Sequence, residues 1–231
     1  MKVIWIIVLV LAVVAGWFVV LPAVAPDINE ETVVRAAQVT AGDTLASLNQ
    51  SELALMMYDS AASTNATDIV ILKKKGEMLI KCGRVREAET VYQQVLSLNG
   101  NDPAALVRMG DSLCVKGNLT NAISYYDAAL AVTPGDAKIW LKKGDAYLFM
   151  SHEETKQLQA AAKNLSMQPG FPDYQPASGT QIESMQSYQN AMTSYRKAME
   201  IDPKLSMIVS ARVLAATQNQ VASYQDLLNN F

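Results

Sequence analysis

The sequence predicts an all-α solenoid, a stack of antiparallel helix pairs that is preceded by one transmembrane helix. Two observations carry this prediction. Four glycines recur every 34 residues without a gap, and an acidic residue follows each one: Gly42, Gly76, Gly110 and Gly144. A long uncharged run stands near the N-terminus. Since a constant period of about 20–50 residues marks a chain built from stacked repeats, the glycines decide the architecture of most of the chain.

Other positions keep the same period. Alanines stand twelve residues after three of the glycines, at Ala54, Ala88 and Ala122. Tyrosines follow these alanines by four residues, at Tyr58, Tyr92 and Tyr126. Aspartates occupy the last position of three repeats, where a carboxylate can cap the next helix: Asp68, Asp102 and Asp136. Gly83 and Gly117 mark turns between the two helices of a repeat. The pattern therefore predicts two helices for each 34 residues.

These residues resemble the tetratricopeptide repeat, which has this period and a W-x2-L-G-x2-Y…A-x3-F…P pattern. The matching residues are Trp140, Gly144 and Tyr147 in one repeat, Ala122, Tyr126, Ala129 and Pro134 in another, and Ala191, Tyr195, Ala198 and Pro203 in a third. The resemblance covers residues 35–205 and implies that each tyrosine fills the space beside a glycine. Lys75 and Lys143 depart from it, because leucine is usual at their position.

The pattern divides the chain into an anchor, residues 1–26, and a repeat domain, residues 27–231. The expected repeats are 35–68, 69–102, 103–136, 137–170 and a degenerate fifth, 171–205, before capping helices at 205–230. In the fourth repeat, a capping box at Ser151 is expected to open the second helix. Prolines and a glycine in 171–180 exclude a regular helix there, so we expect a loop at 168–181 and a helix over 181–202.

Residues 3–25 contain no charge and would reach ~35 Å as a helix, enough for a ~30 Å hydrocarbon core. The sequence favours an uncleaved anchor over a cleaved signal peptide, because the apolar run exceeds the usual length of ~7–15 residues. Lys2 precedes the run and acids follow it, so the expected localisation is a single-pass membrane protein with extracytoplasmic repeats. Four glycosylation sequons agree with this orientation: Asn49, Asn65, Asn118 and Asn164.

The sequence offers no recognisable catalytic chemistry. His152 is the only histidine, so no Ser/His/Asp triad can be assembled around a second one. There is no Cys/His cluster for zinc and no glycine-rich phosphate loop. We therefore expect no enzyme, cofactor or metal. The net charge of −3 and the absence of a basic stripe argue against nucleic acid. Cys82 and Cys114 are interpreted as free thiols, with a disulfide as the alternative.

The resemblance implies a peptide groove lined by the first helices. An acid occupies one groove position in every repeat, between two largely apolar rows. The expected groove residues are Asp43, Lys73, Glu77, Ile80, Val107, Asp111, Leu141, Asp145 and Leu148. Such a groove suits a protein or peptide partner with basic and apolar side chains. The alternative interpretation of the acids is a solvated face without a ligand.

The sequence therefore predicts a non-enzymatic, membrane-tethered adaptor that binds another protein through its groove in a membrane or envelope complex. Two alternatives stay open. The chain is then either a permanent structural subunit of an envelope complex or an accessory factor to a cell-surface enzyme. Salt separates the first two hypotheses, because a steered charged contact weakens with ionic strength and a buried apolar contact does not.

Overall fold

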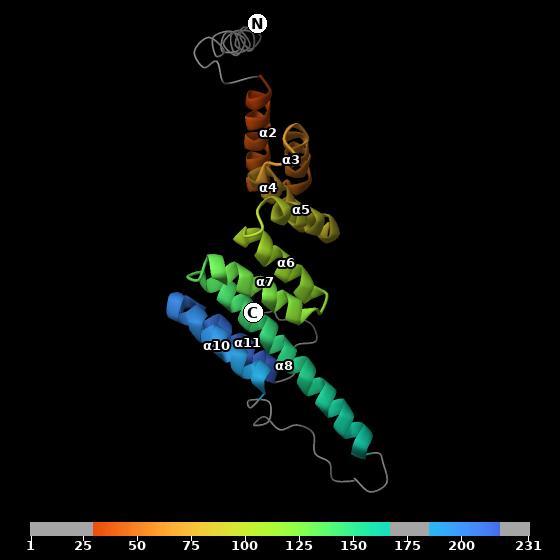
Figure 1. The fold of residues 1–231 in the computed structure, drawn as a ribbon, viewed down its shortest axis with the longest axis vertical. Coiled ribbons are helices and arrows are strands. Elements are labelled where there is room, and N and C mark those ends of the chain that lie inside the picture. Colours follow the sequence, from red (N-terminus) through yellow and green to blue (C-terminus); the bar gives the residue numbers. More distant parts are fainter. Residues whose placement is uncertain (1–29, 167–184, 218–231) are drawn as a thin grey trace. The chain divides into compact units, whose positions relative to one another are not determined.

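The structure is a computed structural model that describes residues 30–166 and 185–217. The contacts divide the chain into two compact units, residues 1–88 and 89–231. Every regular element within the described residues is helical. We describe each unit by itself, using the labels of Figure 1.

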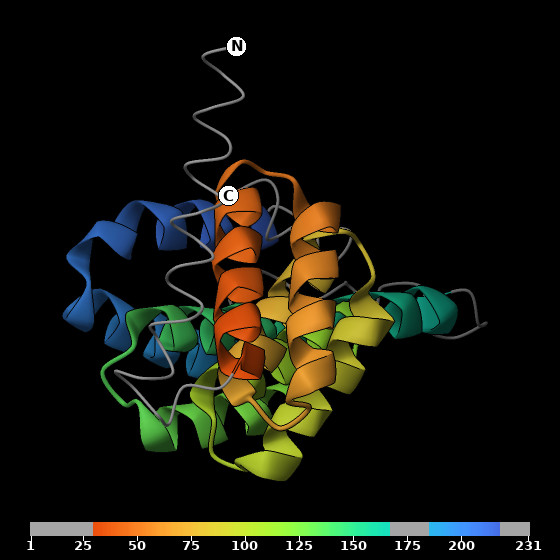
Figure 2. The same cartoon turned by 90° about the horizontal axis from the view of Figure 1, so that it is seen from above.

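The first unit contains α2 (Glu30–Ser47), α3 (Ser51–Thr64) and α4 (Ile69–Lys81). Helices α2 and α3 lie side by side as an antiparallel pair (Figure 2), and α4 packs against α3. Their contact surfaces are apolar: Leu55, Tyr58 and Ala61 of α3 are buried, as are Ile71 and Leu72 of α4. Helix α5 (Val85–Leu98) begins in this unit and continues into the second.

The second unit contains α6 (Pro103–Val115), α7 (Leu119–Val132), α8 (Ala137–Ser166), α10 (Gln186–Ile201), the short 3-10 helix η1 (Pro203–Leu205) and α11 (Ser206–Thr217). Helix α6 pairs with α7, and α8 pairs with α10 (Figure 1). One apolar cluster joins them, and its centre is formed by small and aromatic side chains: Ala122, Tyr126, Ala129, Ala146, Leu148, Ala191, Tyr195 and Ala198.

The predicted caps and turns are confirmed. The carboxylate of Asp68 accepts hydrogen bonds from the backbone N–H groups of Val70 and Ile71 at the start of α4. The carboxylate of Asp102 caps α6 in the same way, and Asp136 accepts from the N–H of Lys138. Gly83 and Gly117 have positive φ angles of 75° and 77°. Glycine adopts this left-handed conformation without a steric cost, so the chain can reverse after a first helix.

The fourth repeat differs from the prediction, because α8 runs for 30 residues without a turn. Ser151 does not open a new helix: its hydroxyl donates to the carbonyl of Leu148, and Thr155 donates to the carbonyl of Ser151. The physical reason is local. The residues that reverse the chain in the first three repeats are Asn49, Gly83 and Gly117, all with positive φ. Serine, which stands 34 residues after Gly117, does not favour that conformation, so the helix continues.

The partner of the first half of α8 is therefore α10, which follows in the chain only after residue 185. The segment 171–180, the anchor 1–26 and most of the capping region 205–230 lie outside the described residues. The expected start of the last second helix at 181 also lies outside them, and α10 begins at Gln186.

The predicted single-pass membrane localisation is wrong for the part of the chain that the structure describes. No helix within 30–166 and 185–217 is both long enough and apolar enough to cross a bilayer. Helix α8 has the length but carries charges along its course, including Lys142, Lys143 and Asp145. The run 3–25, on which the prediction rested, is outside the described residues.

Candidate binding surface on the first helices

Asp43 of α2 joins three helices. Its carboxylate accepts a hydrogen bond of 2.7 Å from the hydroxyl of Tyr58 on α3. It also forms an ion pair with Lys74 of α4, which stands 31 residues later in the chain. The side chain of Asp43 retains 47% of its exposure. The acid that the sequence assigns to a groove therefore also connects one repeat to the next.

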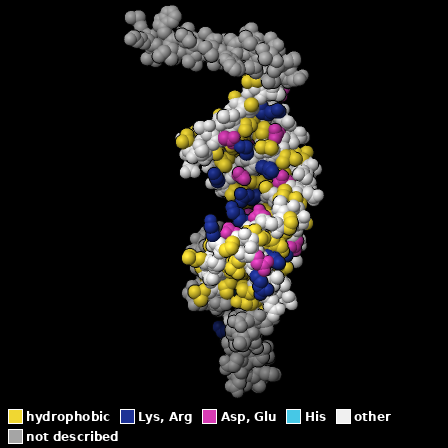
Figure 3. All heavy atoms as spheres, turned by 90° about the vertical axis from the view of Figure 1, so that its left-hand side faces the viewer, with side chains coloured by type: hydrophobic (Ala, Val, Ile, Leu, Met, Phe, Trp, Pro, Cys, Tyr) yellow, Lys and Arg dark blue, Asp and Glu magenta, His cyan; other side chains and the backbone are white. Residues whose placement is uncertain are grey.

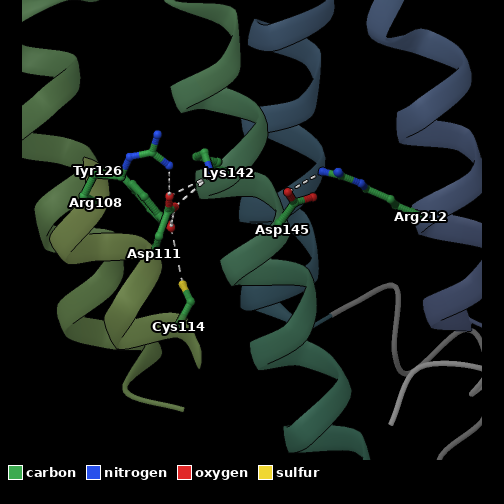
Figure 4. Close-up of polar contacts among 7 residues, drawn as sticks. All are labelled: Arg108, Asp111, Cys114, Tyr126, Lys142, Asp145 and Arg212. Carbon is green, nitrogen blue, oxygen red and sulfur yellow. Dashed lines mark hydrogen bonds and ion pairs between the residues drawn. The ribbon is translucent and has the colours of Figure 1, made fainter. Parts of the chain in front are cut away.

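Asp111 of α6 repeats this arrangement in the second unit, as Figure 4 shows. Its carboxylate accepts a hydrogen bond of 2.8 Å from the hydroxyl of Tyr126 and lies 2.8 Å and 3.0 Å from the ammonium of Lys142. Arg108 approaches to 3.7 Å. Since the hydroxyl proton of Tyr126 is donated to Asp111, the thiol of Cys114 donates to the same hydroxyl oxygen at 3.5 Å.

Asp145 of α8 has a third version of the cluster, in which all members are buried. The hydroxyl of Tyr195 on α10 donates to Asp145 at 2.8 Å, and Arg212 of α11 forms an ion pair with the other carboxylate oxygen (Figure 4). These partners stand 50 and 67 residues after Asp145. In the two earlier clusters the corresponding separations are 15 and 31. The longer separations place α10 as the second helix of the fourth repeat and α11 as the first helix of the next.

The environment changes the pKa of several groups. The hydrogen bonds from Lys74 and then from Tyr58 lower the pKa of Asp43, because they stabilise its charged form. Burial and the neighbouring Asp43 raise the pKa of the Tyr58 hydroxyl. Burial raises the pKa of Asp145, and the guanidinium of Arg212 opposes that rise.

A second ion pair recurs beside the first and explains the two lysines that depart from the repeat pattern. Lys75 lies 2.7 Å from Asp59, and Lys143 lies 2.5 Å from Asp127. Lys143 also lies over the rings of two aromatic residues on α8, Trp140 and Tyr147. In both units, the lysine on one first helix pairs with an acid on the preceding second helix, where leucine would only supply packing.

Each described glycine–tyrosine pair makes the close contact that the repeat pattern implies. A Cβ on Gly42 would lie 2.6 Å from the ring of Tyr58, and one on Gly110 would lie 2.6 Å from the ring of Tyr126. For Gly144 the ring is that of Tyr195, again at 2.6 Å. The tyrosine therefore stands 51 residues after the glycine instead of 16.

The predicted groove residues fall into two groups. Some reach solvent: Asp43 and Glu77 are exposed, and the half-exposed members are Lys73, Ile80, Val107 and Asp111. Others are buried: Leu141, Asp145 and Leu148. Helices α10 and α11 contribute partners of Asp145, so its carboxylate is not available at the surface.

The sequence reasoning missed the basic partners of the acids. Lys74 and Lys142 follow Asp43 and Asp111 by 31 residues, and this constant separation was a usable signal. Basic and acidic side chains are interspersed on the face of the molecule that Figure 3 shows. Much of the acidic charge on the first helices is therefore balanced within the chain. No group of three potential metal ligands exists among the described residues.

Helix α6 presents one stripe that still reaches solvent. Four residues on it share a helical face by their spacing: Ala104, Val107, Asp111 and Val115. Ala104 is exposed, Val107 and Asp111 are partly exposed, and Val115 is 58% exposed. The stripe therefore combines apolar side chains with a single carboxylate that Lys142 partly neutralises.

Comparisons with known proteins agree with this architecture. Residues 75–137 and 107–163 match one tetratricopeptide repeat model, and residues 183–205 match another. No curated protein matches the chain in sequence. Proteins with tetratricopeptide folds are generally interaction scaffolds without enzymatic activity, and they bind protein or peptide partners.

Solved structures resemble the chain in fold. MamA from MSR-1 shares 14% identity over 79% of this chain and 82% of its own, with a TM-score of 0.50. TTC0263, a tetratricopeptide repeat protein of Thermus thermophilus, shares 21% identity over 80% and 99%, with a TM-score of 0.46. YrrB, a tetratricopeptide repeat protein with an unusual peptide-binding site, shares 19% over 75% and 89%, with a TM-score of 0.46. The chain thus contains tetratricopeptide repeats and folds as an all-α solenoid of that type.

Proposed function

We propose that this chain is a non-enzymatic adaptor that binds a protein or peptide segment through the exposed stripe of α6. The observation that carries the proposal is the stripe itself: Val107 and Val115 leave apolar surface exposed on either side of Asp111. Apolar side chains on a rigid helix can hold a partner, and a carboxylate between them can orient it.

The partner is a segment with apolar side chains and a basic group. The apolar side chains contact Val107 and Val115, and the basic group approaches Asp111. Because Lys142 already lies 2.8 Å from Asp111, the carboxylate adds less attraction than an unpaired one would. The apolar contacts therefore supply most of the affinity, and moderate salt weakens binding only slightly.

The test uses a phage-displayed library of random peptides selected on the full chain. The dissociation constant of a selected peptide is then measured by calorimetry for the original chain and two variants. Val107→Asp places a charge in the stripe and is expected to weaken binding at least tenfold. Val132→Asp is the matched control: Val132 is an exposed valine on α7, and its replacement is expected to leave affinity unchanged. Equal affinity for both variants would refute the assignment to α6.

The contribution of Asp111 is best measured from the peptide side. Replacing Asp111 would also remove the contacts with Tyr126 and Lys142 and disturb the fold. Norleucine is instead placed at each basic position of the selected peptide. A loss of about threefold to tenfold, smaller at high salt, is expected. If no library peptide is selected by a chain that is helical by circular dichroism, an adaptor role for the free chain is rejected, and a permanent structural subunit becomes the better hypothesis.

A further inference from the structure

Helix α11 occupies the place of a first helix. Its Arg212 pairs with Asp145, as Lys74 pairs with Asp43 and Lys142 with Asp111. In every case the basic residue belongs to the first helix after a complete helix pair. First helices α2, α6 and α8 are each covered by a second helix, namely α3, α7 and α10. By this logic a further second helix belongs on α11.

One face of α11 is buried and the opposite face is exposed. Val209, Arg212 and Ala215 are buried within the second unit. Met207 is 81% exposed, and Leu214, two turns later on the same side, is 56% exposed. The last unit of a solenoid normally presents a polar outer face, because nothing further stacks on it. The large apolar side chains on this face are therefore an exception that a covering segment would remove.

We propose that the C-terminal segment, residues 218–231, docks on the Met207 and Leu214 face of α11 and completes a fifth repeat. The length of this segment fits the role. Fourteen residues follow Thr217, and a three-residue turn such as 116–118 leaves eleven. Eleven residues span ~16 Å as a helix, close to the ~18 Å of α11.

The sequence of the segment supports the same docking. Its apolar residues recur three or four positions apart, as one helical stripe requires: Val221, Tyr224, Leu228 and Phe231. The close glycine–tyrosine contact is also absent from both partners together. Val213 stands 18 residues after Tyr195, where Gly144 stands 18 residues after Tyr126, and the residue 16 further on is Asn229. A second helix without the tyrosine can pack on a first helix without the glycine.

Photo-crosslinking in the full chain tests the docking directly. Leu214 is replaced by p-benzoylphenylalanine, and a 1:1 mixture of ¹⁴N- and ¹⁵N-labelled chains is irradiated and digested. The expected product is a crosslink within one chain between α11 and residues 218–231. The same probe at Val132, on α7, controls for non-specific crosslinking. A crosslink between differently labelled chains would show that a second copy occupies the face and would overturn the proposal, as would the absence of any crosslink to 218–231.

Hydrogen exchange supplies an independent readout that does not need the photo-probe. Leu228→Asp, within the apolar stripe of the segment, is expected to accelerate exchange of the α11 amides about tenfold or more, because an apolar side chain loses its buried site. Ser223→Asp adds the same charge off the stripe and is expected to have no such effect. Equal exchange in both variants and the original chain would contradict the docking.

Discussion

Tyr195 covers Gly144 although the two residues are 51 positions apart, and a Cβ on Gly144 would lie 2.6 Å from two atoms of the tyrosine ring. The same tyrosine donates a hydrogen bond to Asp145, the residue after that glycine. This contact brings α10 against α8 in the place that a second helix takes in the other repeats. It makes the fourth repeat complete despite the long intervening segment.

Gly144→Ala is expected to destabilise the second unit. The added methyl group must displace the Tyr195 ring, which is buried, and such overpacking costs about 1–3 kcal/mol. The better helix propensity of alanine returns about 1 kcal/mol, so a net loss remains. Urea denaturation followed by circular dichroism measures it. Gly135→Ala is the matched control, since a Cβ there meets nothing within 4 Å. Comparable losses in the two variants would show that the contact does not matter.

Arg212→Met is expected to cost far more stability than Lys142→Met. Arg212 is buried with Asp145, so its removal leaves a carboxylate that is fully buried without its ion pair. Breaking a buried pair costs about 3–5 kcal/mol. Lys142 retains 28% exposure, and a partly exposed pair contributes about 1 kcal/mol or less. Thermal denaturation of both variants provides the comparison, and equal losses would contradict the burial argument.

Asp43 is expected to titrate below the ordinary pKa of an aspartate, because Lys74 and Tyr58 donate hydrogen bonds to its carboxylate. Its contribution to stability is therefore present above the unfolded pKa of about 3.9 and is lost as the pH falls through the lower folded pKa. Carboxyl NMR titration measures the shift. Lys74→Met is expected to move the pKa upward, whereas Lys81→Met, on the same helix, is the control. An unchanged pKa in the Lys74 variant would refute the assignment.

Asn49→Ala is expected to destabilise the turn between α2 and α3. Asn49 has a φ of 57°, and a left-handed alanine costs about 1–2 kcal/mol. Asn49→Gly, in contrast, is expected to be neutral or to stabilise by up to about 1 kcal/mol, since glycine holds the same position at Gly83 and Gly117. Melting temperatures of the three chains test this order. A glycine variant less stable than the alanine variant would disprove the role of backbone conformation.

Local rules worked where the structure depends on neighbouring residues. The aspartates at the repeat ends form caps because a carboxylate close to a helix start reaches the free N–H groups of that helix. Gly83 and Gly117 turn the chain for an equally local reason. Asn49 was overlooked as the third member of this set, although it precedes Gly83 by the same 34 residues.

The candidate site was only partly accessible to sequence reasoning. The period identifies the acids on the first helices, but not what surrounds them. Asp43 keeps much of its exposure, whereas Asp145 is buried by contacts with residues 50 and 67 positions away. A variant that replaces Glu77, Asp111 and Asp145 together would therefore disturb the fold, and it is a poor test of binding.

The sequence by itself determined the repeat period, the all-α class, the caps and two of the turns, because each depends on residues a few positions apart or on a constant spacing. Tertiary structure decided which helix completes the fourth repeat. Ser151 cannot end α8, so the glycine of that repeat must find its tyrosine elsewhere, and Tyr195 is the residue whose ring and hydroxyl fit Gly144 and Asp145. Packing and burial select that partner over a long stretch of chain, and no local pattern records the choice.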